Sequence, residues 1–132
     1  MISSIFVNLP VENLKRSVEF FTQLGFKFNP QFTDDESTCM IVNDTIYVML
    51  LEHKKFSGFI DKPIAAKETT EAILSFSLGS PDEVRAMTSR ALELGARKLK
   101  EPEDLGFMFG WGFEDLDGHL WEMFWMNPEQ VL

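Results

Sequence analysis

The chain carries one arrangement of strand, helix and glycine stop twice, and this internal repeat constrains its fold more than any other feature. Gly25 and Gly95 each follow a helix-like stretch and lie 70 positions apart. The same offset aligns Leu14 with Val84, the first apolar residues of those stretches. An internal period of this kind is typical of a duplicated structural unit, so we expect two copies of one βαβββ unit.

One helix is predicted in each copy. The first covers residues 14–24, where apolar residues recur at helical spacing and Gly25 supplies the stop. The second covers residues 81–94, which Ser80 and Glu83 open with the spacing of a capping box. The two helices therefore have matching start and stop signals.

Strand-like runs surround both helices, with one before each helix and three after it. Asn43-Asp44 and Asp117-Gly118 are predicted to form the last turn of each copy. The last strands align with an offset of 74 rather than 70, so the second copy should hold four additional residues. The predicted strands cover residues 4–9, 27–33, 38–42, 45–52, 73–78, 97–100, 107–114 and 119–126.

These elements predict a single α+β domain over residues 1–132. The copies span about residues 2–52 and 71–126, and residues 53–70 link them. Apolar residues in the linker, such as Phe56, indicate a part that packs down as a short helix. Two such modules would form a curved mixed sheet with the helices on its outer face. The concave inner face would then be open to a small ligand, since ligand sites are mostly apolar and concave.

The acidic composition excludes several classes of partner. The formal net charge is -9, whereas binding to nucleic acid or to an anionic membrane surface needs clustered Lys and Arg. The same charge would suit a cationic ligand, and it also serves solubility. Cys39 is the single cysteine and lies in an apolar run, so we expect a buried thiol and no disulfide within the chain. With no basic leader and no apolar run of about 20 residues, we expect a cytoplasmic protein.

Two segments carry a resemblance to a known superfamily. Residues 11–26 and residues 113–123 resemble the opening and the ending of vicinal oxygen chelate proteins, which include glyoxalase I, bleomycin-resistance proteins and extradiol dioxygenases. Within this group the chain is similar to bacterial proteins catalogued as predicted lactoylglutathione lyases. The resemblance covers essentially the whole chain and implies the glyoxalase/bleomycin-resistance fold and a homodimer. One fold hosts many chemistries, so whether the chain is an enzyme stays open.

The resemblance also implies where a metal would bind. Enzymes of the superfamily hold a divalent ion with four side chains from the first and last strands of each half, which correspond here to Phe6, Val48, Phe76 and Glu122. The repeat gives the same positions, because it matches the first of these with the third and the second with the fourth. A divalent ion needs several oxygen or nitrogen donors, and Glu122 alone offers one, so we expect no metal and no cofactor. Glu52 is expected to be solvated at the end of its strand; the alternative is that Glu52 and Glu122 together form an improvised metal site.

Glu122 and a run of aromatic residues are the remaining site candidates. Within an apolar cavity, Glu122 would be the catalytic general base or a ligand anchor; alternatively, an Arg, Lys or backbone amide pairs with it. Four rings alternate along one strand face, where they form either a stacking wall for a ligand or ordinary helix–sheet core. These rings belong to Phe107, Phe109, Trp111 and Phe113. The expected ligand-binding residues are Phe6, Val48, Phe76, Trp111, Glu122 and Phe124.

Three functions fit these features. The first is a metal-free domain of the bleomycin-resistance type, which binds a small organic molecule between its halves or between the subunits of a dimer. The second is a metal-dependent lyase of the glyoxalase I type, which acts on a glutathione hemithioacetal; the four mapped positions oppose it. The third is a protein–protein module whose cavity is filled by its own rings. We expect the first.

Overall fold

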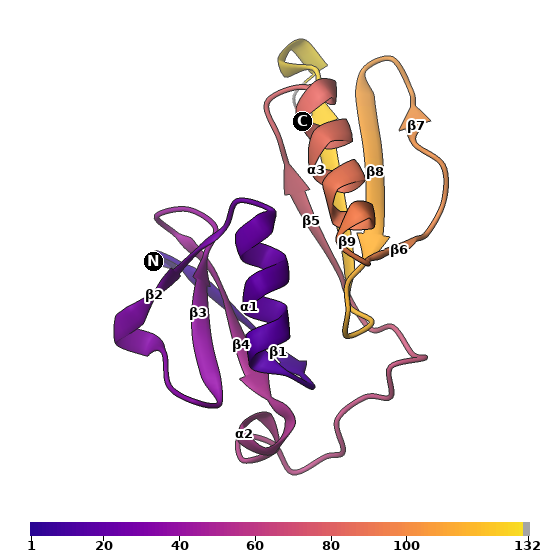
Figure 1. Cartoon of the computed structure of the whole chain (residues 1–132). Coiled ribbons are helices and arrows are strands. Elements are labelled where there is room, and N and C mark those ends of the chain that lie inside the picture. The colour runs from indigo at the N-terminus through magenta and orange to yellow at the C-terminus, as the bar shows by residue number, and fades with distance from the viewer. Residues whose placement is uncertain (131–132) are drawn as a thin grey trace. The chain divides into compact units, whose positions relative to one another are not determined.

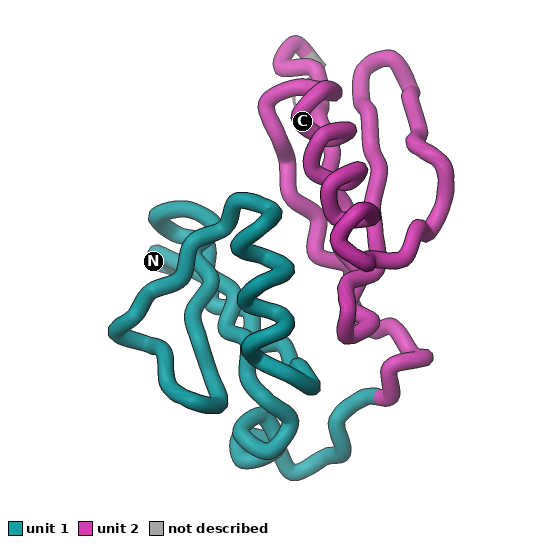
Figure 2. Tube along the Cα trace, viewed as in Figure 1, with its two compact units in different colours: residues 1–65 teal, residues 66–132 magenta. Residues whose placement is uncertain are grey.

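The computed structural model describes residues 1–130 and divides the chain into two compact units (Figure 2). Unit 1 comprises residues 1–65, and unit 2 comprises residues 66–132. Each unit is built from one mixed sheet and one main helix, which confirms the α+β fold class. None of the described helices combines the length and the apolar composition that a membrane-spanning segment needs.

Unit 1 contains a four-stranded sheet, one main helix and two short helices (Figure 1). Its elements are β1 (Ile5–Val11), α1 (Leu14–Gln23), β2 (Lys27–Asn29), the 3-10 helix η1 (Pro30–Phe32), β3 (Ser37–Ile41), β4 (Ile46–Glu52) and α2 (His53–Ser57). The strand order is β1-β4-β3-β2. Strands β1 and β4 run parallel, and the other neighbours are antiparallel.

Unit 2 repeats this topology. Its elements are β5 (Ile73–Ser77), α3 (Pro81–Glu93), β6 (Arg97–Lys98), β7 (Glu103–Asp104), β8 (Met108–Glu114), β9 (Leu120–Met126) and the 3-10 helix η2 (Pro128–Gln130). The strand order is β5-β9-β8-β6, with β5 parallel to β9 and with β7 paired to β8. The first strand of each unit thus pairs with its last strand, which confirms the duplicated βαβββ unit.

Three local features depart from, refine or confirm the predicted elements. The strand predicted over residues 27–33 ends at Asn29, because Pro30 lacks an N–H and the Asn29 side chain accepts from the Gln31 N–H at 2.9 Å. The chain turns there into η1. The short helix expected in the linker is confirmed as α2. The second copy is also longer, as predicted, because α3 has 13 residues against 10 in α1 and because the connection from β6 to β8 exceeds that from β2 to β3 and contains β7.

Helix α1 begins where two side chains accept hydrogen bonds from its first turn. Asn13 is the N-cap, and its side chain accepts from the Arg16 N–H at 3.0 Å. Glu52, at the end of β4, accepts from the Leu14 N–H at 2.9 Å. The positive end of the helix dipole also stabilises a carboxylate at this position. Glu52 therefore fastens the start of α1 to the sheet.

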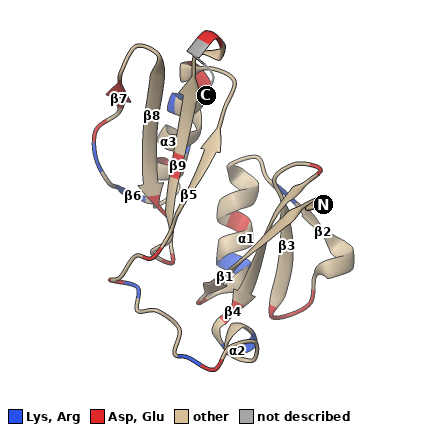
Figure 3. Ribbon diagram, turned by 180° about the vertical axis from the view of Figure 1, so that it is seen from behind, with Lys and Arg blue, Asp and Glu red and all other residues tan. Residues whose placement is uncertain are grey.

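Each sheet has one face that its main helix covers and an opposite face without a main helix, here called the helix-free face, as each unit shows by itself in Figures 1 and 3. In unit 1, Met40, Val48 and Leu50 are fully buried on the face that α1 covers. In unit 2, Phe113 and Trp121 are buried on the face that α3 covers. Because successive strand residues point to opposite sides, their sequence neighbours lie on the helix-free face.

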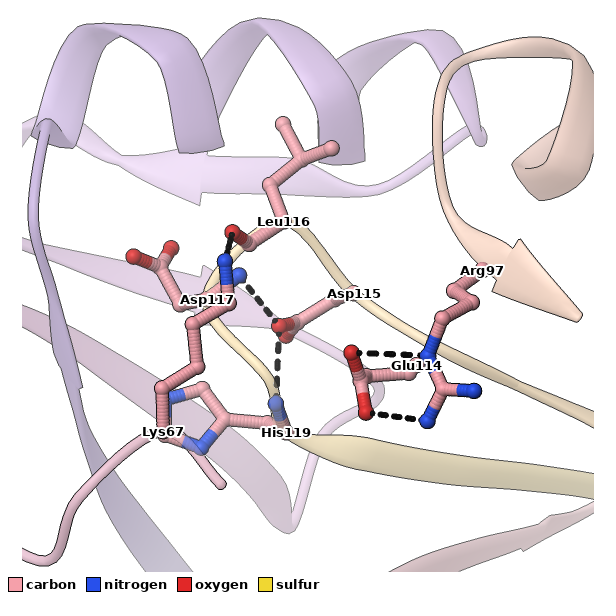
Figure 4. Close-up of polar contacts among 7 residues, drawn as sticks. All are labelled: Lys67, Arg97, Glu114, Asp115, Leu116, Asp117 and His119. Carbon is pink, nitrogen blue, oxygen red and sulfur yellow. Dashed lines mark hydrogen bonds and ion pairs between the residues drawn. The ribbon is translucent and has the colours of Figure 1, made fainter. Parts of the chain in front are cut away.

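Asp115 organises the turn between β8 and β9 (Figure 4). Its carboxylate accepts from the Trp121 indole at 2.8 Å and from the backbone N–H groups of Asp117 and His119 at 2.9 and 3.0 Å. Burial raises the pKa of Asp115, and the charge of His119 and these hydrogen bonds offset part of that rise. Gly118 completes the predicted turn with a φ of 88°, a conformation that favours glycine.

The same turn is held from two further sides (Figure 4). The Lys67 ammonium donates to the Leu116 carbonyl oxygen at 3.4 Å, and a Cβ at Gly118 would meet the backbone oxygen of Lys67 at 3.0 Å. Arg97 on β6 donates to both carboxylate oxygens of Glu114, at 2.8 and 3.2 Å, which lowers the Glu114 pKa. These contacts join the start of unit 2 and β6 to its last hairpin.

Glu52→Ala should lower the free energy of unfolding by about 1 kcal/mol, because the Leu14 N–H loses its acceptor at the start of α1. Glu52→Gln keeps an acceptor oxygen and should cost less. Urea denaturation of both variants measures the effect, with Glu71→Ala at an exposed position as the control. A Glu52→Ala variant as stable as that control would contradict the capping role.

Asp115→Ala should cost roughly 3 kcal/mol of unfolding free energy at neutral pH, because three N–H groups lose a buried acceptor. Burial raises the folded-state pKa of Asp115 above the ordinary 3.8, so the folded protein binds this proton more tightly than the unfolded chain does. The resulting stabilisation is complete below pH 3.8 and is lost as the pH rises through the folded-state pKa. The deficit of the variant should therefore grow on acidification.

Chemical denaturation at a series of pH values measures this deficit. The exposed Asp61→Ala is the control and should show no such growth. If the deficit of Asp115→Ala shrank on acidification, burial would not be the dominant influence on Asp115.

Candidate functional site

A pocket of about 490 Å³ lies on the helix-free face of unit 1. Its walls and floor come from the sheet, from η1 with the segment that follows it, and from α2 with the segment that follows that helix. The lining residues are Asn8, Gln31, Phe32, Thr33, Asp34, Ser37, Met49, Leu51, Lys55 and Phe59. All of them belong to unit 1, so this site is complete within one βαβββ copy and its flanking segments.

The register of the sheet places the floor of the pocket. Asn8 on β1 and Met49 on β4 are neighbours in register, as are Ser37 on β3 and Leu51 on β4. All four share one face because residues two apart on a strand point the same way. Helix α2 contacts β1 and β4, and η1 contacts β3, so both border this floor.

The charged groups of the pocket come from its walls. Strands β1, β3 and β4 are uncharged up to their ends (Figure 3). Asp34 and Lys55 supply the charges and form an ion pair of 3.2 Å. The Asp34 carboxylate also accepts from the Glu36 backbone N–H at 2.8 Å and from the Ser37 hydroxyl at 3.0 Å.

These contacts decide the protonation state of Asp34. The backbone N–H of Glu36, then the Ser37 hydroxyl and the Lys55 ammonium, lower the pKa of Asp34 to about 2. Asp34 is therefore ionised throughout the physiological range. A carboxylate held by three donors provides a fixed negative charge that positions Lys55.

Two aromatic rings at the pocket lie largely in water. Phe59 is 72% exposed and Phe32 is 55% exposed. Large apolar side chains that flank a concave surface are typical of binding sites. Together with Met49 and Leu51, these rings give the pocket an apolar part beside its ion pair.

Phe6 and Val48, two of the mapped positions, lie on opposite faces of the unit 1 sheet. Phe6 is in register with Tyr47 and stacks on it, with ring centroids 4.6 Å apart. Phe6 is on the helix-free face and is 49% exposed. Val48 follows Tyr47 on β4, so it points to the opposite face and is buried under α1. Phe6 thus shares the face of the pocket without lining it, and Val48 lies in the core.

Phe76 and Glu122 are likewise separated by the sheet of unit 2. Phe76 is in register with Met123 and meets Trp121 edge-on, with ring centroids 5.5 Å apart, on the helix-covered face. Glu122 is in register with Ser75 on the helix-free face, where the Ser75 hydroxyl donates to its carboxylate at 3.2 Å. The partner that the structure gives Glu122 is a hydroxyl, not the Arg, Lys or backbone amide considered from sequence.

A difference in helix length explains why the offset of 70 misplaced Phe76. Helix α3 has 13 residues and α1 has 10, so the helix starts are 67 positions apart while the glycine stops are 70 apart. In a strand, an offset that is wrong by an odd number exchanges the two faces. With the offset of 67, Asn8 matches Ser75, and their partners in register are Met49 and Glu122.

The aromatic run along β8 is mainly core. Phe109 and Phe113 are buried on the helix-covered face, which confirms the core alternative for these two rings. Trp111 shares that face, and its indole donates to the Lys100 carbonyl oxygen at 3.0 Å. Phe107 precedes β8 and is exposed. Trp111 therefore does not share a face with Glu122.

Phe124 is the predicted ligand-binding residue that shares the helix-free face of unit 2 with Glu122. Gly110 and Gly112 are their neighbours in register on β8 and leave this part of the face bare. A Cβ at Gly112 would overlap the carbonyl oxygen of Trp121, so glycine permits the close approach of β8 to β9. Ligand contact by Phe124 and Glu122 stays a prediction.

The residues present do not fit a four-ligand metal centre. Phe6, Val48 and Phe76 carry no donor atoms, and their replacement by the structurally matched positions adds only amide, thioether and hydroxyl groups to the Glu122 carboxylate. Glu52 is engaged with the start of α1 instead of joining Glu122. Within residues 1–130, no three His, Cys, Asp or Glu side chains are grouped to hold a metal ion. A divalent cation would find one strong ligand here, and its desolvation would be largely uncompensated.

The pocket residues escaped sequence reasoning for identifiable reasons. Asn8 is a polar residue within an apolar strand, and this interruption of the apolar run could have marked it. Asp34 and Lys55 lie 21 positions apart, in a loop and in the linker, and they match no motif. Only the fold brings them together.

Comparison with known proteins places the chain in a family. A family model described as bleomycin resistance protein-like N-terminal matches residues 3–43. No curated protein matches the chain in sequence. A hypothetical protein from S. aureus is 30% identical, with a TM-score of 0.80, and the match covers 94% of each chain.

Two more distant solved structures share the fold. A glyoxalase-related enzyme from Fulvimarina pelagi is 16% identical, with a TM-score of 0.78, and the match covers 95% of this chain and 88% of that one. A glyoxalase/bleomycin resistance protein/dioxygenase family enzyme from Burkholderia phytofirmans PsJN is 13% identical, with a TM-score of 0.76, over 92% and 96% of the chains. The repeated βαβββ topology and these matches identify the chain as a member of the vicinal oxygen chelate superfamily, the glyoxalase/bleomycin-resistance group.

Proposed function

We propose that unit 1 binds a small organic molecule in the pocket on its helix-free face, without a resident metal. The pocket itself carries this proposal. Its volume of about 490 Å³ lies within the roughly 300–1,000 Å³ typical of ligand pockets. Met49, Leu51 and two exposed rings give it an apolar part, and polar side chains that can orient a ligand line the rest. The bleomycin-resistance-like family model that matches β1 to β3 supports binding of an organic compound.

The pocket chemistry favours binding over catalysis. Asp34 has a pKa of about 2, so it is a poor proton acceptor at neutral pH. Its ion pair with Lys55 holds the two charges in place as recognition groups. The chain therefore offers recognition groups at this site, and these suit a protein that sequesters or carries its ligand.

The exposed rings supply much of the expected binding energy. Phe32 and Phe59 lie in water in the free protein, and each would lose apolar surface to a ligand that sits between them and the floor. Complete burial of such a side chain is worth roughly 1.5–3 kcal/mol, so partial cover by the ligand gives part of that. Met49 and Leu51 extend the same apolar surface beneath the ligand.

A thermal-shift screen of small organic acids, amides and amines should yield compounds that raise the melting temperature, because a ligand of the folded state stabilises it. Phe59→Ala should weaken binding of such a compound roughly tenfold, because the ring no longer covers it. Isothermal titration calorimetry measures the dissociation constants of both proteins.

Phe107→Ala removes an exposed ring of unit 2 that does not line the pocket, and it serves as the matched control. The control should bind as the wild type does. Compounds that stabilise the chain but bind equally to Phe59→Ala would place the ligand elsewhere and contradict the proposal.

Metal titration tests the second part of the proposal. Protein freed of metal by chelation should take up no stoichiometric Ni²⁺, Zn²⁺ or Mn²⁺, because Glu122 is the single strong donor among the mapped positions. Calorimetry and elemental analysis measure the uptake, and Glu122→Gln should behave as the wild type does. One tightly bound ion per chain that disappears in Glu122→Gln would refute a metal-free protein.

A further inference from the structure

We infer that the molecule bound by unit 1 carries an acidic group, such as a carboxylate or phosphonate, that pairs with Lys55. This inference rests on the proposed function because it concerns the same pocket. It adds the charge of the ligand, and it runs against the cationic ligand that the net charge of -9 suggests.

More unused hydrogen-bonding capacity lies on the Lys55 side of the ion pair than on the Asp34 side. Asp34 already accepts three hydrogen bonds, from the Glu36 N–H, the Ser37 hydroxyl and the Lys55 ammonium. A lysine ammonium has three N–H donors, and the 3.2 Å contact with Asp34 uses one of them. Within residues 1–130, its other donors are open to an acceptor that enters the pocket.

Lys55 is held in place before a ligand arrives. One Asp34 oxygen is fixed by the loop contacts from Glu36 and Ser37, and the other oxygen receives Lys55. The Lys55 side chain is 35% exposed, so most of its stem lies against the protein. An acid that binds here therefore bears little of the cost of ordering a long side chain.

A cationic ligand fits the same groups less well. It would compete with the Lys55 ammonium for Asp34 and bring two positive charges close together. An acid instead leaves the pair intact and extends it to an alternating row of carboxylate, ammonium and ligand anion. A neutral amide could accept from Lys55, but hydrogen bonds between charged partners are roughly twice as strong.

The rest of the lining defines the body of the acid. Met49 and Leu51 supply the apolar part of the floor, and Phe32 and Phe59 are exposed beside it. Among the described residues that line the pocket, Lys55 is the one cation. The ligand class is thus a small acid with an apolar or aromatic body.

Matched probe sets test this inference on the full-length chain. The acids are pentanoate, 3-phenylpropionate and indole-3-propionate, and each is compared with its primary amide and with the amine of the same skeleton. Backbone amide shifts of the pocket residues in NMR spectra locate binding, and titration gives the dissociation constants. Each acid that binds should do so roughly tenfold more tightly than its amide, and the amine should bind most weakly.

Two lysine variants assign the difference to one residue. Lys55→Met keeps an apolar stem without the charge and should abolish the advantage of the acid over the amide. If Lys55→Met does not fold, Lys55→Gln serves as the uncharged variant. Lys54→Met changes the preceding residue on α2, which does not line the pocket, and should keep the advantage within about twofold.

The outcomes separate the two proposals. An amide or amine that binds the pocket as tightly as its acid would overturn the acidic ligand and leave the proposed function standing. An acid whose advantage survives the loss of the Lys55 charge would also overturn it. If no probe shifts the pocket resonances, the ligand pocket and the acidic ligand fall together.

Discussion

Each sheet of this chain is accompanied by one main helix, and a helix can cover only one of the two faces of a sheet. Val48 and Leu50 of β4 and the buried residues of β8 and β9 lie under α1 or α3 for this reason. Unit 1 borders its second face with η1 and α2, which convert a flat surface into a pocket. Unit 2 leaves Glu122 and Phe124 beside two glycines on the corresponding face. The contrast between the two copies follows from what surrounds the second face.

The sequence predicted the elements well because their signals are local. The caps at Asn13 and Ser80 and the glycine stops define both helices, and strand alternation defines the sheets. It was harder to predict which sheet face each strand residue occupies. The three additional residues of α3 change the offset between the copies by an odd number, so Phe76 lies on the helix-covered side. The pocket itself could not be predicted, since the contact between Asp34 and Lys55 depends on how a loop and the linker pack against the sheet.

Acidic residues give this chain more than solubility. Glu52 accepts from the first turn of α1, Asp115 gathers three N–H groups at the last turn, and Asp34 holds Lys55. Glu114 pairs with Arg97 through both carboxylate oxygens. A net charge of -9 describes none of these placements, so composition alone suggested a cationic ligand where the pocket presents an ammonium group. Local geometry decides the electrostatics of this site.

The walls of the pocket are not part of the repeated unit. Helix η1 lies in the connection between β2 and β3, and α2 lies in the linker after β4, whereas the corresponding connection in unit 2 carries β7. The buried core and the walls of the pocket are therefore encoded in different stretches of the chain. Mutations in η1 and α2 can reshape the binding surface while the buried residues beneath α1 stay unchanged. A duplicated scaffold of this kind can acquire new ligands through drift in its connections, with little risk to its ability to fold.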